Sequence, residues 1–275
     1  GGSSALVLAA RCQSNMDSAD SIRQFLVQVS SKNKEDAAAA KQSLEKQPTD
    51  GGVSRDVLDV VLASLRNNQK PPTIAAACDF LTYVVTEVDL QEYYYLLIPA
   101  VSVFCLDIKK DVKQSSRKCL ETLYGTVVNK DLAELIPDLL KAIYDPKLTE
   151  TTIDRVAATK FVTTVTAGTV SILCPLLLRG YALRKDKSSR LCSKIIVNML
   201  QLVDNYADVE NFLPVLTPPV QAASESVSDP EARSTISACI QSLGSMEKLK
   251  EQATAQASAA PEGAEELCNC DFTLA

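Results

Sequence analysis

The residues best suited to metal or redox chemistry are Cys268 and Cys270, in the run EELCNCDFTLA near the end of the chain. A Cys-x-Cys spacing is tighter than that of ordinary structural zinc sites, which take further ligands from other Cys or His residues. No other Cys or His lies nearby, and the sequence contains no histidine. Apolar and polar residues alternate through residues 268–274, so we interpret this run as a strand and not as a metal clip.

The chain lacks the residues and motifs of common catalytic sites. The absence of histidine excludes Ser-His-Asp and Cys-His arrangements, and neither a GxxxxGK[ST] nor a GxGxxG phosphate loop is present. Nine cysteines are scattered through the sequence, and we expect Cys105, Cys119, Cys174 and Cys192 to be reduced and buried, because each lies in an apolar stretch. We therefore expect no catalytic, metal or cofactor site within this chain.

Two groups of basic residues could contact phosphate. The first basic cluster comprises Lys109, Lys110, Lys113, Arg117 and Lys118, and the second basic cluster comprises Arg179, Arg184, Lys185, Lys187, Arg190 and Lys194. The formal net charge of the chain is −6, so it is not a general nucleic-acid binder, and any contact should be local and sensitive to salt. The alternative is that these are ordinary solvated side chains near helix ends.

The elements that position these clusters follow from an internal repeat. The tripeptides LIP, LCP and their relatives end at Pro99, Pro137, Pro175 and Pro214, at intervals of 38, 38 and 39 residues. A period near 40 residues built from two amphipathic helices is typical of HEAT and armadillo solenoids. Aromatic residues make up only 5% of the chain against 46% hydrophobic residues in total, which favours closely packed helices.

We predict an all-α fold, an α-α superhelix of about six HEAT-type helix pairs. The predicted segments are an N-terminal cap or partial helix over 1–19, the solenoid over 20–246, an acidic and Ala-rich linker over 247–266, and a strand over 267–275. Each repeated proline should remove a backbone hydrogen bond and bend the first helix of its pair. Both basic clusters lie at the turn and second-helix start of their pairs, so a solenoid should place them along one edge.

A further pattern is compatible with two interpretations. Acidic residues at the turns are Asp107, Asp145 and Asp229, and arginines of the second helices are Arg117, Arg155, Arg190 and Arg233. These side chains either bond between adjacent repeats, as in HEAT proteins, or serve as ordinary helix caps and solvated surface.

The tail EELCNCDFTLA resembles the opening of the first ATP-binding cassette of translation elongation factor 3, where an acidic linker leads into such a strand. The segments KFVTTVTAGTVSILCPLLLRG (160–180) and SDPEAR (228–233) are similar to the last HEAT repeats of that family. One departure is the linker, in which about two dozen residues after Leu243 are too few for the four-helix segment that the family usually inserts there.

The resemblance implies a ribosome-docking arm of a cytoplasmic ABC-type ATPase that promotes exit-site tRNA release and late translocation. Its partners would be ribosomal RNA and proteins of the small-subunit head, with the two basic clusters as the contact edge. ATP and magnesium would bind in cassettes that lie outside this chain, and the arm would be monomeric, without DNA or membrane contacts. The alternative is a generic protein-docking HEAT scaffold, such as the HEAT region of a translational activator of the starvation-response kinase.

Overall fold

The computed structural model describes residues 19–31, 34–44 and 53–259. Over these ranges the chain consists of helices and turns, without a strand. The predicted N-terminal cap and the predicted strand with Cys268 and Cys270 lie outside the described residues. No described helix is long and apolar enough to cross a membrane.

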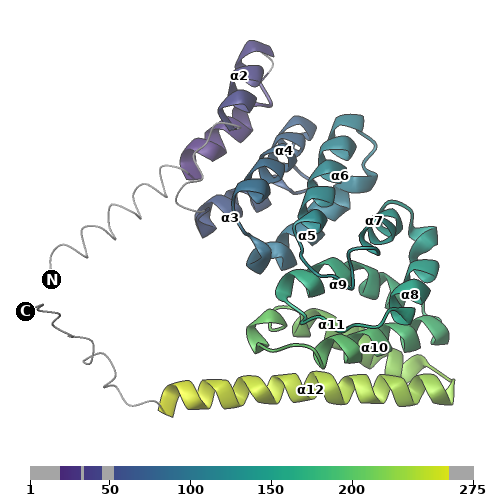
Figure 1. Ribbon diagram of the computed structural model, residues 1–275. Helices are drawn as coiled ribbons and strands as arrows, with labels where there is room; N and C mark the ends of the chain where they lie inside the picture. The colour runs from purple at the N-terminus through teal and green to yellow at the C-terminus, as the bar shows by residue number, and fades with distance from the viewer. Residues whose placement is uncertain (1–18, 32–33, 45–52, 260–275) are drawn as a thin grey trace, which may run out of the picture.

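The helices form successive antiparallel pairs that stack into a single array (Figure 1). The pairs are 19–28 with α2 (Lys34–Leu44), α3 (Arg55–Ser64) with α4 (Pro71–Glu87), α5 (Tyr94–Ser102) with α6 (Lys110–Gly125), α7 (Ile136–Tyr144) with α8 (Thr149–Ala158), α9 (Ala167–Ala182) with α10 (Asp186–Leu200), and α11 (Leu213–Ser226) with α12 (Pro230–Ala259). Short 3-10 turns complete the connections at η1 (Gln91–Tyr93), η2 (Val103–Leu106), η3 (Pro146–Leu148) and η4 (Tyr206–Asp208). The predicted all-α solenoid of about six pairs is confirmed.

Local capping explains where several helices begin. The Ser54 hydroxyl accepts a hydrogen bond from the Val57 amide at the start of α3, and the Thr166 hydroxyl accepts one from the Thr169 amide at the start of α9. The α4 helix begins with Pro71 and Pro72, where a missing backbone amide costs little because the first amides of a helix have no intrahelical partner. These caps fix the residue at which each helix begins, and the apolar residues of each helix then lie on the face that packs into the core.

The four repeated prolines occupy two different helical positions. Pro99 lies inside α5 and Pro175 inside α9, as the predicted bend requires. Pro137 and Pro214 instead stand in the first turn of α7 and α11, so they interrupt no helical hydrogen bond there. The prediction of a bend at each proline is therefore wrong for α7 and α11. These two helices begin one residue before the repeated proline, whereas α5 and α9 begin several residues before it.

One continuous hydrophobic core runs through the array from Ala19 to Leu243. Helix α9 has eleven buried residues and lies between its neighbours, and the buried Tyr124 hydroxyl of α6 donates a 3.0 Å hydrogen bond to the Ile172 carbonyl of α9. The six described cysteines, which include the four at 105, 119, 174 and 192, are free and buried, as predicted. They serve as small apolar side chains between helices.

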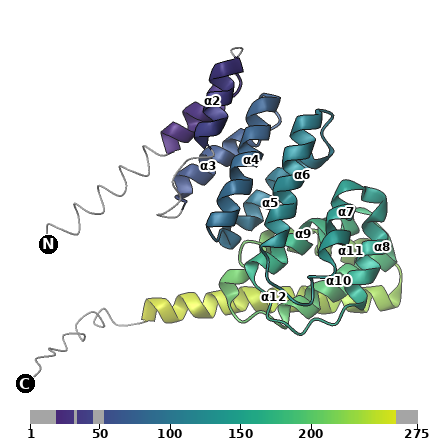
Figure 2. The ribbon, with the colours of Figure 1, turned by 45° about the horizontal axis from the view of Figure 1, so that its top comes forward.

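Helix α12 is longer than the composition of its second half suggested. It runs over 30 residues to Ala259, and both views show its C-terminal part extending beyond the neighbouring helices (Figures 1 and 2). The first thirteen residues of the predicted linker are therefore helical. The sequence from Ser245 to Ala259 contains neither Pro nor Gly and is rich in Ala, Gln, Glu and Lys, which favour helix even without an apolar stripe.

Candidate functional site

The first basic cluster lies where η2 turns into α6. The Asp107 carboxylate accepts a 2.7 Å hydrogen bond from the Lys109 amide and so fixes the entry into the helix. Lys109, Lys110 and Lys118 are exposed and Lys113 is half-buried. Among the described residues no acidic side chain forms an ion pair with any of these four lysines. Four ammonium groups are thus available along the first half of α6, from Lys109 before its first turn to Lys118 at its middle.

Arg117 belongs to the same cluster by sequence but has a different role. Its Nε donates a 2.9 Å hydrogen bond to the Cys105 carbonyl, and its guanidinium lies 4.4 Å from the centre of the Tyr144 ring. Tyr144 is the last residue of α7, and its hydroxyl donates to Glu121 at 3.1 Å. Arg117 therefore joins two repeats, and its contacts place the middle of α6 beside the end of α7.

Three residues of the second basic cluster are paired with acids of neighbouring repeats. Lys185 Nζ lies 2.7 Å from Glu150 in the first turn of α8, and Lys187 Nζ lies 2.8 Å from Asp154 at the middle of α8. On the other side, Arg190 Nη1 lies 2.6 Å from Glu231 at the start of α12. These ion pairs connect α8, α10 and α12, the second helices of three successive pairs. Because each of the three basic side chains faces a carboxylate, its charge is neutralised locally.

Arg179 is also engaged inside the protein. Its Nη1 donates to the Ala142 carbonyl at 2.7 Å and to the Ile143 carbonyl at 3.2 Å, which satisfies two acceptors in the last turn of α7. Arg184, which has a positive φ of 53°, and Lys194 are exposed. In the described part of the chain neither forms an ion pair. Within the described residues, only the first cluster retains most of its charge free of acidic partners.

The acidic residues predicted at the turns act as local caps. Asp107, Asp145 and Asp229 each accept a hydrogen bond from an amide two or three residues further on, at 2.7, 3.0 and 2.8 Å. The capping interpretation is therefore the correct one for these three carboxylates.

The arginines are divided between the two interpretations. Arg155 forms an ion pair with Asp138 in its own helix pair, and Arg233 donates to the Val227 and Ser228 carbonyls at the turn before it, both at 3.1 Å. Arg117 and Arg190 connect adjacent repeats. The HEAT-type interpretation is therefore correct for these two.

Carboxylates that the sequence analysis did not single out connect the repeats. Asp186 Oδ2 accepts hydrogen bonds from the Ser228 and Asp229 amides at 3.2 and 3.0 Å, and these bonds lower the pKa of its carboxyl group. Asp131 Oδ2 accepts from the Val162 and Thr163 amides at 2.8 and 2.7 Å. Burial acts to raise the pKa of Asp131, but these two hydrogen bonds lower it overall. Asp186 lies 42 residues before the turn that it binds and Asp131 lies 31 residues before its turn, so no constant spacing marked these contacts in the sequence.

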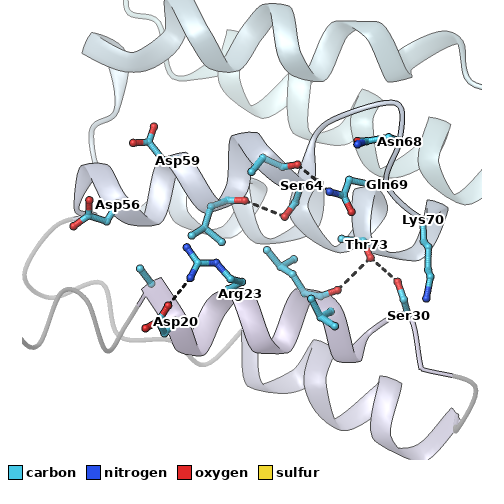
Figure 3. A pocket seen from close by; sticks show the side chains of 15 residues that line it. Asp20, Arg23, Ser30, Asp56, Asp59, Ser64, Asn68, Gln69, Lys70 and Thr73 are labelled. Atoms are coloured by element: carbon cyan, nitrogen blue, oxygen red, sulfur yellow. Dashed lines mark hydrogen bonds and ion pairs between the residues drawn. The ribbon is translucent and has the colours of Figure 1, made fainter.

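A hollow near the N-terminal end of the array is the alternative candidate (Figure 3). It has a volume of about 720 Å³ between the 19–28 helix, α3 and the start of α4. Several of its polar side chains have partners: Arg23 pairs with Asp20 at 2.6 Å, the Ser64 hydroxyl donates to the Val60 carbonyl, and Thr73 donates to the Leu26 carbonyl. We interpret the hollow as loose packing of the terminal repeat. Likewise, no described group of three or more Cys, Asp or Glu side chains is arranged to hold a metal ion.

Residues 147–255 match the sequence model of the family described as "Elongation factor 3/GNC1 HEAT repeat". Residues 147–255 are therefore an elongation factor 3/GNC1-type HEAT-repeat region. It is 32% identical over 199 residues to elongation factor 3 of Pneumocystis carinii, a match that covers 72% of this chain and 19% of that protein. It is 40% identical over 137 residues to elongation factor 3 of Candida glabrata and 38% identical over 137 residues to elongation factor 3A of Saccharomyces cerevisiae, which covers 50% of this chain and 13% of each relative. The chain thus spans a fifth or less of the length of these relatives.

The matched family segment corresponds to the second half of the array. It begins at η3 and includes α8, α9, α10, α11 and most of α12, and therefore contains the second basic cluster with its ion pairs. The first basic cluster lies before it, in the α5–α6 pair. Within this elongation factor 3-type region the second cluster has a structural role, as its contacts with α7, α8 and α12 demonstrate.

Proposed function

We propose that this chain is a ribosome-docking arm of an elongation factor 3-like translation factor and that the first basic cluster lies at the contact. The observation that carries this proposal is the set of lysines Lys109, Lys110, Lys113 and Lys118 along the first half of α6, which form no ion pair within the described residues, in a chain whose relatives are named elongation factor 3. Solvated ammonium groups without acidic partners are suited to contact an anionic surface, of phosphate or of carboxylate groups, and such contacts weaken as salt is added.

The proposal for the full-length parent is broader. The parent would be a cytoplasmic ABC-type ATPase that uses ATP and magnesium, bound in cassettes outside this chain, to promote exit-site tRNA release and late translocation. This arm would be monomeric and would contribute binding and orientation, with no chemical step of its own. Arg184 and Lys194 would add to the contact. The other basic residues would instead connect adjacent helix pairs, namely Arg117, Arg179, Lys185, Lys187 and Arg190.

The first experiment is co-sedimentation of the chain with purified Saccharomyces cerevisiae ribosomes across a salt series. If two to four lysines make ionic contacts, we expect affinity to fall on the order of 10- to 100-fold between 50 and 200 mM salt. The double variant Lys109→Glu and Lys110→Glu should lose most of the low-salt binding. The matched control is Lys130→Glu and Lys160→Glu, two exposed lysines from the loops at the far ends of α6 and α8.

Equal binding of the two double variants would contradict the proposed contact, and absence of sedimentation at low salt for the unmodified chain would contradict ribosome docking itself. Circular dichroism of each variant should match that of the unmodified chain, because all four lysines are exposed.

A second candidate function follows from the breadth of the family description, which includes GNC1 as well as elongation factor 3. A GNC1-type parent would use the array as a scaffold for protein docking and would have no ATP-binding cassette after it. The coding sequence downstream of Ala275 in the parent gene distinguishes the two. A GxxxxGK[ST] motif within the next few dozen codons would favour the elongation factor, and its absence would favour the scaffold.

A further inference from the structure

The turn that carries the first basic cluster also exposes three large aliphatic side chains. Val103 is 59% exposed, Leu106 is 45% exposed and Ile108 is 95% exposed. Single exposed aliphatic residues are normal on protein surfaces, but a contiguous group rimmed by charge indicates an interaction site. These three lie within six residues of each other, next to Lys109 and Lys110.

This turn is held in place by the core beneath it. Phe104 and Cys105, between the exposed residues, are 3% and 0% exposed. The Asp107 amide donates a 3.0 Å hydrogen bond to the Phe104 carbonyl, and the Asp107 carboxylate accepts from the Lys109 amide at 2.7 Å. Ile108 is therefore presented to solvent by a fixed backbone at the end of a helix pair.

A groove with apolar walls adjoins the turn. It has a volume of about 530 Å³ between the first halves of α4 and α6, and Pro71, Pro72 and Val112 line it. Lys109 and Lys118 also line it, as do the carboxylates of Asp79 and Asp111. The turn thus contributes exposed aliphatic side chains, and the groove that it meets at Lys109 contributes further apolar side chains with lysines and two carboxylates among them.

We propose that residues 103–110 and the adjoining groove dock a protein segment that carries aliphatic and carboxylate side chains. The proposal rests on the proposed function and names the partner class at its contact: a protein on the ribosome, and not RNA. An apolar centre with a charged rim is the usual composition of a protein–protein interface. RNA-binding surfaces instead rely on arginine and on aromatic rings that stack against bases.

The side chains available here favour protein over RNA. The only arginine of the first basic cluster, Arg117, is occupied by the Cys105 carbonyl and the Tyr144 ring. Residues 103–110 contain one aromatic residue, Phe104, which is buried. A phosphate surface would leave the Ile108 side chain without an apolar partner, whereas a protein segment would cover it and pair its carboxylates with the lysines.

The test is a photo-crosslink from position 108. The full 275-residue chain carries p-benzoyl-phenylalanine in place of Ile108, or, as the control, in place of Val128, which is 89% exposed at the other end of α6. After irradiation with purified Saccharomyces cerevisiae ribosomes, we expect a protease-sensitive, RNase-resistant adduct from position 108 alone. An RNA adduct, an equal adduct from position 128, or no adduct while the chain still sediments would overturn the inference. Failure to sediment would overturn the proposed ribosome docking and the inference with it.

A second measurement separates the apolar from the ionic contribution. Ile108→Ser should weaken ribosome binding about tenfold at every salt concentration, because burial of an aliphatic side chain does not depend on counterions. Lys109→Ser should instead reduce the dependence of binding on salt. Val128→Ser is the matched control and should change neither quantity. If Ile108→Ser binds like Val128→Ser, the apolar centre makes no contact and the inference is wrong.

Discussion

At the scale of single residues, the buried thiols couple the fold to alkaline pH. Burial raises the pKa of Cys105 from 9.0 to about 11 and the pKa values of Cys119 and Cys192 to about 12. In the unfolded chain these thiols ionise near their ordinary pKa. Above that pH the unfolded state binds fewer protons than the folded state, so the free energy of unfolding must fall as pH rises.

We therefore expect stability to be constant from pH 6 to 8 and to decrease between pH 9 and 11. Each thiol should contribute a slope on the order of 1 kcal/mol per pH unit in that window. The plateau is the internal control, because the chain has no histidine to titrate there. Urea unfolding followed by circular dichroism at pH 7, 9 and 10.5 measures both regions. A midpoint that stays unchanged up to pH 10.5 would show that the thiols do not remain protonated in the fold.

At the scale of elements, Gly180 sets how closely three helices approach. It is a buried residue of α9, and a Cβ at this position would meet the Cys192 sulfur of α10 and lie 2.6 Å from Ile153 Cδ1 of α8. The close approach explains why a residue with poor helix propensity stands inside a helix. Gly244 in α12 offers a contrast, because no atom outside its own helix lies within 4 Å of a Cβ built there.

These two glycines should respond in opposite directions to the same substitution. Gly180→Ala should lower the free energy of unfolding by about 1–3 kcal/mol, because the added methyl group overpacks the junction of α8, α9 and α10. Gly244→Ala should leave stability unchanged or raise it by up to about 1 kcal/mol through helix propensity. Thermal unfolding of both variants checks the pair. Equal shifts would mean that α9 can move away from its neighbours without cost.

The elements also show how far the sequence could be interpreted. The spacing of Pro99, Pro137, Pro175 and Pro214 was sufficient to predict the helix pairs, because an apolar stripe must recur with each repeat of a solenoid. It could not predict the ion pairs of Lys185 and Lys187, since these depend on the rotation between adjacent pairs, which leaves no periodic signal. The helical course of α12 beyond Met246 was missed because propensity, and not an apolar pattern, maintains it.

At the scale of the whole molecule, the two described ends of the array are packed differently. Helix α9 has eleven buried residues, whereas Ala40 is the single buried residue among the described side chains of α2. The 19–28 helix contributes Ala19, Ile22 and Leu26 to the core but borders the hollow of Figure 3. In a solenoid each repeat is stabilised by its neighbours, so a terminal repeat with a small interface should open before the rest.

Hydrogen exchange measured by mass spectrometry tests this gradient, and Thr73 offers a specific perturbation. The Thr73 hydroxyl donates to the Leu26 carbonyl at 3.2 Å and is hydrogen-bonded to Ser30, so it joins α4 to the preceding repeat. Thr73→Val removes both bonds at nearly constant volume and should accelerate exchange in 19–28 about tenfold. Exchange in α9 should not change, because that helix opens only with the array as a whole. The control is Ser64→Ala, which lines the same hollow but loses only a bond to Val60 within α3. Equal acceleration in 19–28 and α9 would show that the array unfolds as one cooperative unit and that its terminal repeat has no separate opening.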